Sequence, residues 1–160
     1  MRVETFFHNI VDPTLGVLAQ IINIPVTDKA RVLVTTIAGQ ESEWAARRQH
    51  GGPARSYWQF ELGGGVAELF AVTPNQLRIV CSALDIPYDQ ATVFEAMAWN
   101  DALACSMARL LLWQDPAALP EVGDVEAGWA YYLRNWRPGA PHHDVWAECY
   151  SMSLAAMKSP

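Results

Sequence analysis

The chain has 160 residues, of which 51% are hydrophobic and 11% aromatic, enough to build one hydrophobic core in a single domain covering residues 1–160. Its formal net charge of −6 argues against a nucleic-acid-binding protein, which needs a broad basic face to neutralise phosphates. The sequence has no secretory signal core and no uncharged apolar run of about 18 residues, so we expect synthesis in the cytoplasm and no stable insertion into a membrane.

Helix signals dominate along the chain. Capping residues and apolar periodicity predict helices over residues 3–22 with a break at Asp12-Pro13, from Thr27 or Asp28 to 43, over 73–84, over 89–99, from Asn100 or Asp101 to 113, from Asp124 through "EAGWAYYLRNW", and over 144–157. The segment 102–113 is apolar nearly all round, which indicates a helix surrounded by other helices. Only "RSYWQFELGG" suggests a short strand or hairpin. We therefore expect a mainly α fold with a central buried helix and at most a small β-hairpin.

The three cysteines, Cys81, Cys105 and Cys149, are odd in number and widely spaced. Cys105 lies in the apolar run "DALACSMARLLLW", where a cysteine usually serves as a small hydrophobic residue. We interpret all three as free thiols of a protein made in a reducing compartment.

Two glutamates near the end of the helix predicted over 28–43 differ in their environment. The residues at positions i−4, i−7 and i−8 from Glu41 are apolar, so Glu41 continues the buried stripe, whereas Glu43 lies on a more polar face. Burial and the carbonyl end of the helix dipole both raise the pKa of a carboxyl group. Glu41 is therefore a candidate general acid. The alternative is a half-buried glutamate bonded to an arginine or a backbone amide.

The stretch "IAGQESEWAARRQHGGPARSYWQF", from Ile37 to Phe60, resembles the signature of the lytic transglycosylase and goose-type lysozyme group within the lysozyme-like superfamily. In that group an apolar helix ends in Glu-Ser-x-aromatic and a glycine-rich turn ending in Gln follows. On this match Glu41 takes the place of the glutamate and Gln59 that of the glutamine. The chain departs from the pattern at Ser56, where the group has glycine. The group's Tyr-Asn-x-Gly element corresponds only to "WAYYLRNWRPG", with Tyr131 or Tyr132 in the tyrosine's place.

The resemblance implies a lysozyme-like helical domain, related to small muralytic proteins of bacteriophages, that acts on peptidoglycan glycan strands. Glu41 then protonates the β-1,4 bond between N-acetylmuramic acid and N-acetylglucosamine. A lytic transglycosylase needs no second carboxylate, whereas a lysozyme requires one or a held water, and Glu61 is the candidate for that role. The protein would act as an endolysin released by a holin, or as a virion component.

The candidates for supporting roles in substrate binding are Ser56, Tyr57, Trp58, Gln59, Tyr131 and Tyr132. Gln59 is expected to bond a sugar N-acetyl group or orient Glu41, and Tyr57 or Trp58 to form an apolar wall, since alternation along a strand would expose one and bury the other. Either aromatic residue could instead belong to the core. The stripe Trp129, Tyr132, Leu133 and Trp136 recurs at helical spacing and is interpreted as core, with one tyrosine, Tyr131 or Tyr132, reaching the cleft.

Other chemistries find little support in the sequence. His142 and His143 lack a spaced partner, so no metal is expected, and no motif for a nucleotide or another cofactor is present. One alternative function stays open: a non-catalytic virion structural or glycan-binding module on the same scaffold, with Ser56 marking an altered cleft.

Overall fold

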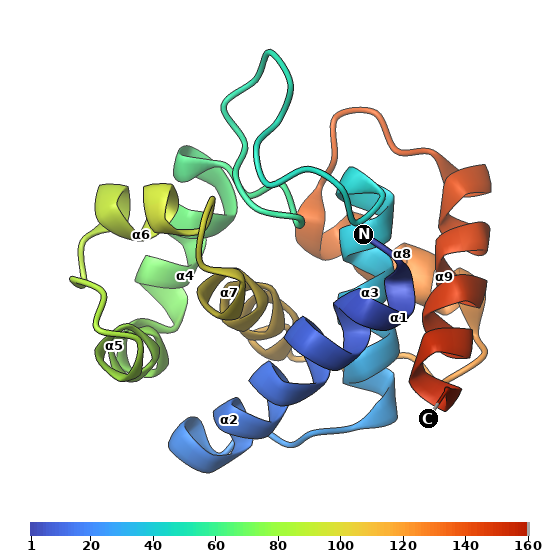
Figure 1. The fold of residues 1–160 in the computed structure, drawn as a ribbon, viewed down its shortest axis with the longest axis horizontal. Coiled ribbons are helices and arrows are strands. Elements are labelled where there is room, and N and C mark those ends of the chain that lie inside the picture. Colours follow the sequence, from blue (N-terminus) through green and yellow to red (C-terminus); the bar gives the residue numbers. More distant parts are fainter. Residues whose placement is uncertain (160) are drawn as a thin grey trace.

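The structure is a computed structural model that describes residues 1–159, and these residues form an all-α fold without a β-strand. The elements in chain order are α1 (Val3–Phe6), the π-helical η1 (Phe7–Val11), α2 (Asp12–Ile22), α3 (Asp28–Ser42), the π-helical η2 (Leu62–Val66), α4 (Ala67–Val72), α5 (Pro74–Ala83), α6 (Gln90–Ala96), α7 (Asp101–Trp113), α8 (Val125–Trp136) and α9 (His143–Lys158) (Figure 1). The prediction of a mainly α protein is confirmed. None of the helices within residues 1–159 combines the length and apolar character needed to cross a membrane.

Side-chain oxygens cap several helices where the sequence predicts them to begin. The capping residues are Thr27, Asp89, Asn100 and Asp124, and each accepts a hydrogen bond of 2.9–3.2 Å from the backbone N–H three residues later. Each cap satisfies a donor that has no partner within the helix, a stabilisation of about 1 kcal/mol. At Pro13 the chain stays helical: the π-helical η1 continues directly into α2, and Pro13 lies in the first turn of α2.

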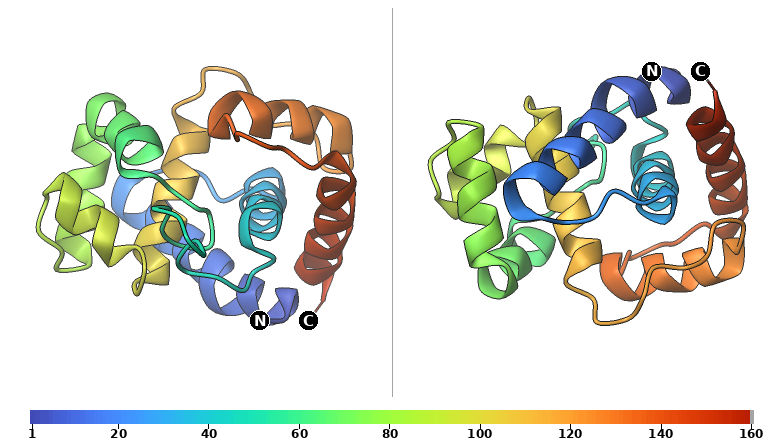
Figure 2. Two further views of the ribbon diagram at one scale, coloured as in Figure 1. Left: turned by 90° about the horizontal axis from the view of Figure 1, so that it is seen from above. Right: turned by 90° about the horizontal axis from the view of Figure 1, so that it is seen from below.

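Helix α7 forms the centre of the molecule. Every residue from Leu103 to Leu112 is buried, as expected from its apolar circumference, and the helix packs against α2, α3, α4 and α5. Helices α4, α5 and α6 lie on one side of α7, and α3, α8 and α9 lie on the other (Figures 1 and 2). The two groups of helices are therefore joined by α7 and also by the continuous stretch η1–α2, in which α2 contacts α5 and η1 contacts α3 and α9.

The segment between α3 and η2 forms turns instead of the expected strand or hairpin. Only isolated bridges occur, joining Arg55 to Arg48 and to Phe60. Ser56 and Gln59 have φ angles of 67° and 50°, and this left-handed backbone turns the chain back on itself where a strand would run straight. A further difference is the helical stretch η2–α4, for which the sequence predicts no helix.

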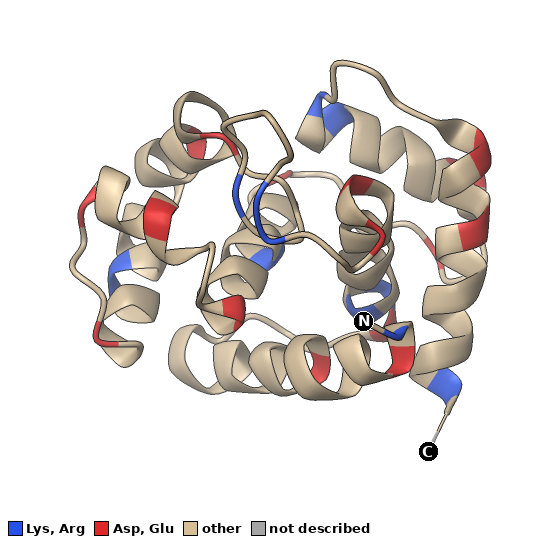
Figure 3. Cartoon of the chain, turned by 45° about the horizontal axis from the view of Figure 1, so that its top comes forward, with Lys and Arg blue, Asp and Glu red and all other residues tan. Residues whose placement is uncertain are grey.

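The basic residues of this segment are paired with acidic residues of α6 and α7. Arg47 donates to both carboxylate oxygens of Asp101, at 2.8 and 2.7 Å, and Arg55 donates to Glu95 at 3.0 Å. Figure 3 shows the basic loop facing acidic positions on the neighbouring helices. The positive charge of the loop is therefore used to hold it against α6 and α7.

Candidate functional site

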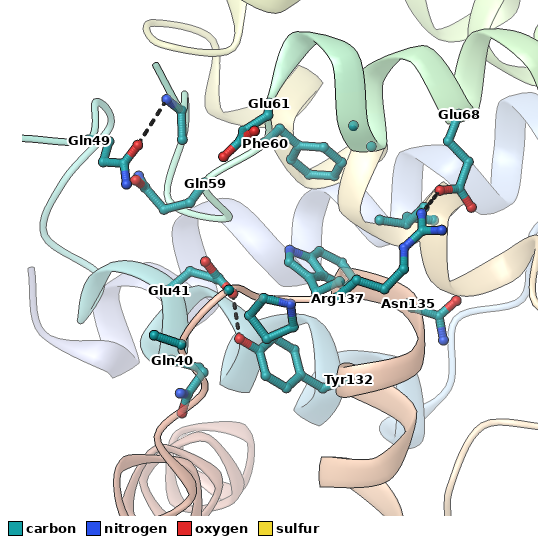
Figure 4. A pocket seen from close by; sticks show the side chains of 18 of the residues that line it. Gln40, Glu41, Gln49, Gln59, Phe60, Glu61, Glu68, Tyr132, Asn135 and Arg137 are labelled. Carbon is teal, nitrogen blue, oxygen red and sulfur yellow. Dashed lines mark hydrogen bonds and ion pairs between the residues drawn. The ribbon is translucent and has the colours of Figure 1, made fainter. Parts of the chain in front are cut away.

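A pocket of about 910 Å³ opens between the two groups of helices. Its walls come from the end of α3, the turns before η2, the stretch η2–α4, the end of α8 and the loop before α9. Acidic and basic side chains are few in its lining, and apart from His142 they are Glu41, Glu61, Glu68 and Arg137 (Figure 4). The pocket is thus acidic, with a single arginine.

Glu41 lies in the last turn of α3 and points into the pocket (Figure 4). The apolar residues that precede it at helical spacing, Ile37, Val34 and Leu33, are all buried, and Glu41 itself is half-buried. Glu43 is exposed and has the left-handed φ of 52° that ends the helix. The separation of the two glutamates inferred from periodicity is therefore present in the fold.

The neighbours of Glu41 hold the end of α3 in place. The Ser42 hydroxyl donates to the carbonyl of Tyr57 at 2.8 Å, and the Gln40 amide donates to the carbonyl of His142 at 3.2 Å. These contacts tie the helix end to the turns on one side and to the loop before α9 on the other. Glu41 consequently sits on a backbone fixed from both sides of the pocket.

The protonation of Glu41 is shifted into the neutral range. Burial raises the pKa of its carboxyl group to about 7, from an ordinary value of 4.5. A hydrogen bond of 2.6 Å from the Tyr132 hydroxyl to Glu41 Oε1 stabilises the ionised form and opposes part of this rise. Near pH 7 the group therefore exists both as an acid able to give a proton and as a carboxylate able to take one.

Tyr132 is fixed by aromatic neighbours. Its ring stacks on Trp146 with centroids 5.1 Å apart and an interplanar angle of 19°, and it also packs against Trp129 and Trp136. Burial and the nearby charge of Glu41 raise the pKa of the Tyr132 hydroxyl, so it stays protonated and remains a donor. Of the two tyrosines considered from the sequence, Tyr132 is the one that reaches the pocket.

Trp136 extends the same helical stripe into the pocket wall, although its place in the stripe predicts a core residue. It is half-buried, its indole N–H donates to the carbonyl of Trp58 at 3.0 Å, and its ring packs edge-on against Phe60 at 5.8 Å. The sequence signal for this position is the spacing of four residues between Tyr132 and Trp136, which places both rings on one face of α8.

Gln59 and Glu61 both line the pocket, as the candidate roles require. The Gln59 amide nitrogen donates to the carbonyl of Ser56 at 2.7 Å, so this group supports the turn and makes no hydrogen bond to Glu41 within residues 1–159. Glu61 is exposed, immediately before η2, and its side chain does not cap that helix. Its carboxyl group makes no hydrogen bond or ion pair within residues 1–159 and belongs to the pocket lining.

Tyr57 and Trp58 do not form the expected aromatic wall, because both are buried. Tyr57 packs edge-on against Phe6 with centroids 5.1 Å apart, and the Trp58 indole N–H donates to the carbonyl of Val34 at 2.9 Å. The prediction relied on strand alternation, and in a turn successive side chains need not point to opposite sides. Both residues anchor the turn to the core instead of facing a ligand.

Ser56 and Tyr131 also lie away from the pocket. Ser56 is buried with its left-handed φ of 67°, and its hydroxyl accepts a hydrogen bond from the backbone N–H of Trp58 at 3.3 Å. That conformation favours glycine, which explains why glycine is the alternative residue at such a turn. The Tyr131 hydroxyl donates to the buried carbonyl of Leu112 at 2.8 Å, so this tyrosine serves the core.

Glu68 and Arg137 were not found from the sequence. Glu68 on α4 forms an ion pair with Arg137, which follows α8, and the Gln114 amide donates to the other Glu68 oxygen at 3.1 Å. Figure 4 shows the two side chains joined in the lining of the pocket. The two residues are 69 positions apart in the sequence, so no local sequence pattern links them.

The histidines and cysteines have other surroundings. His143 contacts Glu126 at 3.0 Å and packs against Trp129, and no group of three or more metal-ligating side chains suited to an ion occurs within residues 1–159. Cys81, Cys105 and Cys149 are buried and unpaired, and burial raises the pKa of each thiol. His143 and the three cysteines do not line the pocket, whereas His142 does.

Comparison with family models, with curated proteins and with solved structures finds no match to this chain. Its function is therefore inferred from the chemistry of the pocket and from the sequence motif around Glu41.

Proposed function

We propose that this protein cleaves the β-1,4 bond between N-acetylmuramic acid and N-acetylglucosamine in peptidoglycan, with Glu41 as general acid and base. The observation that supports the proposal is a half-buried carboxyl group in a pocket wall, with its pKa raised to about 7 and a fixed tyrosine donor on one oxygen. General acid catalysis is most effective when the pKa lies near the working pH.

The reaction begins with proton transfer from Glu41 to the glycosidic oxygen, and the bond between that oxygen and the anomeric carbon breaks. In a lytic transglycosylase the resulting Glu41 carboxylate takes the proton of the muramic 6-hydroxyl, whose oxygen bonds to the anomeric carbon and closes a 1,6-anhydro ring. In a lysozyme a water supplies the oxygen, with a second carboxylate as base or nucleophile. Glu61 is the candidate for that second role, since Glu68 is engaged with Arg137 and Gln114.

The pocket has features that suit a sugar chain. The Trp136 ring presents an apolar surface beside the Glu41–Tyr132 pair, and the Gln49 and Gln59 side chains offer polar groups in the wall. Its volume of about 910 Å³ is at the upper end of typical small-ligand pockets, which span roughly 300–1,000 Å³. Apolar and amide-bearing surfaces together match an N-acetylated sugar.

We assign the fold, within this proposal, to the lysozyme-like class. Its supporting features are the glutamate at the end of α3, the turn that follows it, and the buried helix α7 behind the pocket. The biological setting that fits is a bacteriophage muralytic protein, either an endolysin released through holin pores or a component of the virion that opens the wall.

The test is the substitution Glu41→Gln, with Glu43→Gln as the matched control. Glu43 is exposed and two residues away, so its replacement removes the same charge outside the pocket. Clearing of purified cell walls should fall by about 10²- to 10⁴-fold in Glu41→Gln and stay unchanged in Glu43→Gln. Circular dichroism must show intact helices in both. Equal clearing by the wild type and Glu41→Gln would reject the proposal.

Mass spectrometry of the products separates the two reaction classes. A lytic transglycosylase leaves 1,6-anhydromuramic ends and tolerates Glu61→Gln, whereas a lysozyme leaves reducing ends. If Glu61 is the second carboxylate of a lysozyme, Glu61→Gln should cost at least about 100-fold in rate. Binding of glycan strands without any cleavage by the wild type would assign the protein instead to the non-catalytic class of virion or glycan-binding modules.

A further inference from the structure

Arg137 is the only arginine or lysine in the lining of an otherwise acidic pocket. Its side chain is 64% exposed and makes a single hydrogen bond within residues 1–159, from Nη2 to Glu68, with which it forms an ion pair. A guanidinium group has five N–H donors in a planar fork that matches a carboxylate. The Nε and Nη1 donors of Arg137 are therefore free to meet a ligand.

Other arginines near the pocket differ from Arg137 in this respect. Arg47 uses two nitrogens on Asp101, and all three nitrogens of Arg55 are engaged. Neither arginine lines the pocket. Free guanidinium donors facing the cavity are thus a property of Arg137 alone among these three residues.

The partner of Arg137 is arranged so that it can release the arginine. Glu68 keeps a second hydrogen bond, from Gln114 at 3.1 Å, when the contact with Arg137 opens. The pair is partly exposed, and ion pairs of this kind contribute little net free energy because water solvates both partners. A carboxylate on a ligand can therefore replace Glu68 at Arg137 at small cost.

We propose that Arg137 binds a carboxylate of the peptide attached to the glycan strand, in exchange for Glu68, and thereby makes the protein selective for peptide-bearing glycans over uncharged ones. This inference rests on the proposed function and names the part of the substrate that the pocket recognises. Glu61 is a further acidic group in the lining and repels an anionic peptide, whereas Glu41 is neutral when it acts as the general acid, so Arg137 is the position that accepts the peptide carboxylate.

The exchange predicts opposite effects for the two ends of one ion pair. Arg137→Gln removes the receptor for the carboxylate and weakens binding, whereas Glu68→Gln removes the competitor and strengthens binding. A purely structural link between the pocket walls predicts the same direction for both substitutions, since either one breaks the link. The sign of the effect therefore separates recognition from support.

The experiment measures binding by calorimetry in the Glu41→Gln background, so that the ligand is not cleaved. Two synthetic glycan tetrasaccharides serve as probes, one whose muramyl peptides end in free carboxylates and one with the same peptides amidated. Arg137→Gln should weaken binding of the acidic probe by about tenfold and leave the amidated probe unchanged. Glu68→Gln should tighten binding of the acidic probe alone.

Arg134→Gln is the matched control, because Arg134 lies on the outer surface of α8, pairs with Asp115 and does not line the pocket. It removes the same charge and should leave both affinities unchanged. An equal loss in Arg134→Gln and Arg137→Gln, or parallel effects of Arg137→Gln and Glu68→Gln, would overturn the inference. If Glu41-dependent cleavage occurs but binding ignores the peptide charge, only this inference fails. If the wild type neither binds nor cleaves either probe, the proposed function fails with it.

Discussion

At the scale of single residues, Glu41 combines two properties that oppose each other. Burial raises the pKa of its carboxyl group, which supplies an acid at neutral pH, but the same burial makes the ionised form costly in the folded state. The Tyr132 hydroxyl offsets part of that cost through its 2.6 Å hydrogen bond. A residue kept for catalysis is expected to reduce stability in this manner.

The first prediction concerns stability against pH in Glu41→Gln. The folded pKa of about 7 lies above the ordinary 4.5, so the contribution of this carboxyl is fully present below pH 4.5 and is lost as the pH rises through 7. The free energy of unfolding of Glu41→Gln minus that of the wild type should therefore be larger at pH 8.5 than at pH 4, by up to about 3 kcal/mol. Urea denaturation at both pH values measures it. An equal difference from the wild type at both pH values in Glu41→Gln would refute the raised pKa.

The second prediction concerns the pH profile of cleavage. Because Glu41 must be protonated, kcat/KM on a soluble glycan should fall about tenfold per pH unit above its pKa near 7. The Tyr132 hydrogen bond lowers the pKa of Glu41, so Tyr132→Phe should move this alkaline limb to higher pH. If Tyr132 had only a structural role, Tyr132→Phe would lower kcat/KM at every pH without moving the alkaline limb.

At the scale of elements, the end of α3 depends on a close contact between Gly39 and Trp44. The Trp44 indole N–H donates to the carbonyl of Thr35 at 2.9 Å, which lays the ring across the helix at Gly39. A Cβ at Gly39 would lie 2.4 Å from the Trp44 ring. The glycine is thus required by packing, two residues before the proposed acid.

The third prediction compares two helical glycines. Gly39→Ala should lower the free energy of unfolding by about 1–3 kcal/mol, because the buried Trp44 ring has to move. Gly16→Ala in α2 meets no atom within 4 Å and should raise it by about 0.5–1 kcal/mol. Thermal or urea denaturation of the two variants measures both. Equal effects would show that the Trp44 contact does not restrict Gly39.

The helices could be predicted from the sequence because their signals are local. Capping residues such as Asn100 and Asp124 act on N–H groups three residues away, and the apolar circumference of α7 indicated its burial directly. The turns between α3 and η2 could not be predicted, because left-handed backbone at Ser56 and Gln59 is set by contacts with the core. Glu41 was found by periodicity, whereas Arg137 and Glu68 meet only through the tertiary fold.

At the scale of the whole molecule, charge sets how the protein meets its proposed substrate. The net charge is −6, and acidic positions are spread over both groups of helices (Figure 3). A bacterial cell wall is itself anionic, so long-range forces oppose the encounter instead of steering it. Short-range contacts inside the pocket must then outweigh this repulsion.

The fourth prediction follows from this repulsion. Cleavage of insoluble cell walls at low enzyme concentration should speed up severalfold when the ionic strength is raised from about 10 mM to about 150 mM, because salt screens the repulsion between exposed charges. An uncharged soluble glycan serves as the control and should show no such increase. A rate on cell walls that falls with added salt would mean that attractive surface charges direct binding.

The most direct test of the account is the release of soluble muropeptides from purified peptidoglycan by the wild type and by Glu41→Gln at pH 6, followed by mass spectrometry. We predict that the wild type releases fragments cut between N-acetylmuramic acid and N-acetylglucosamine, and that Glu41→Gln, with its helices intact, releases almost none. Release of the same fragments at the same rate by both proteins would contradict the assignment of Glu41 as the general acid.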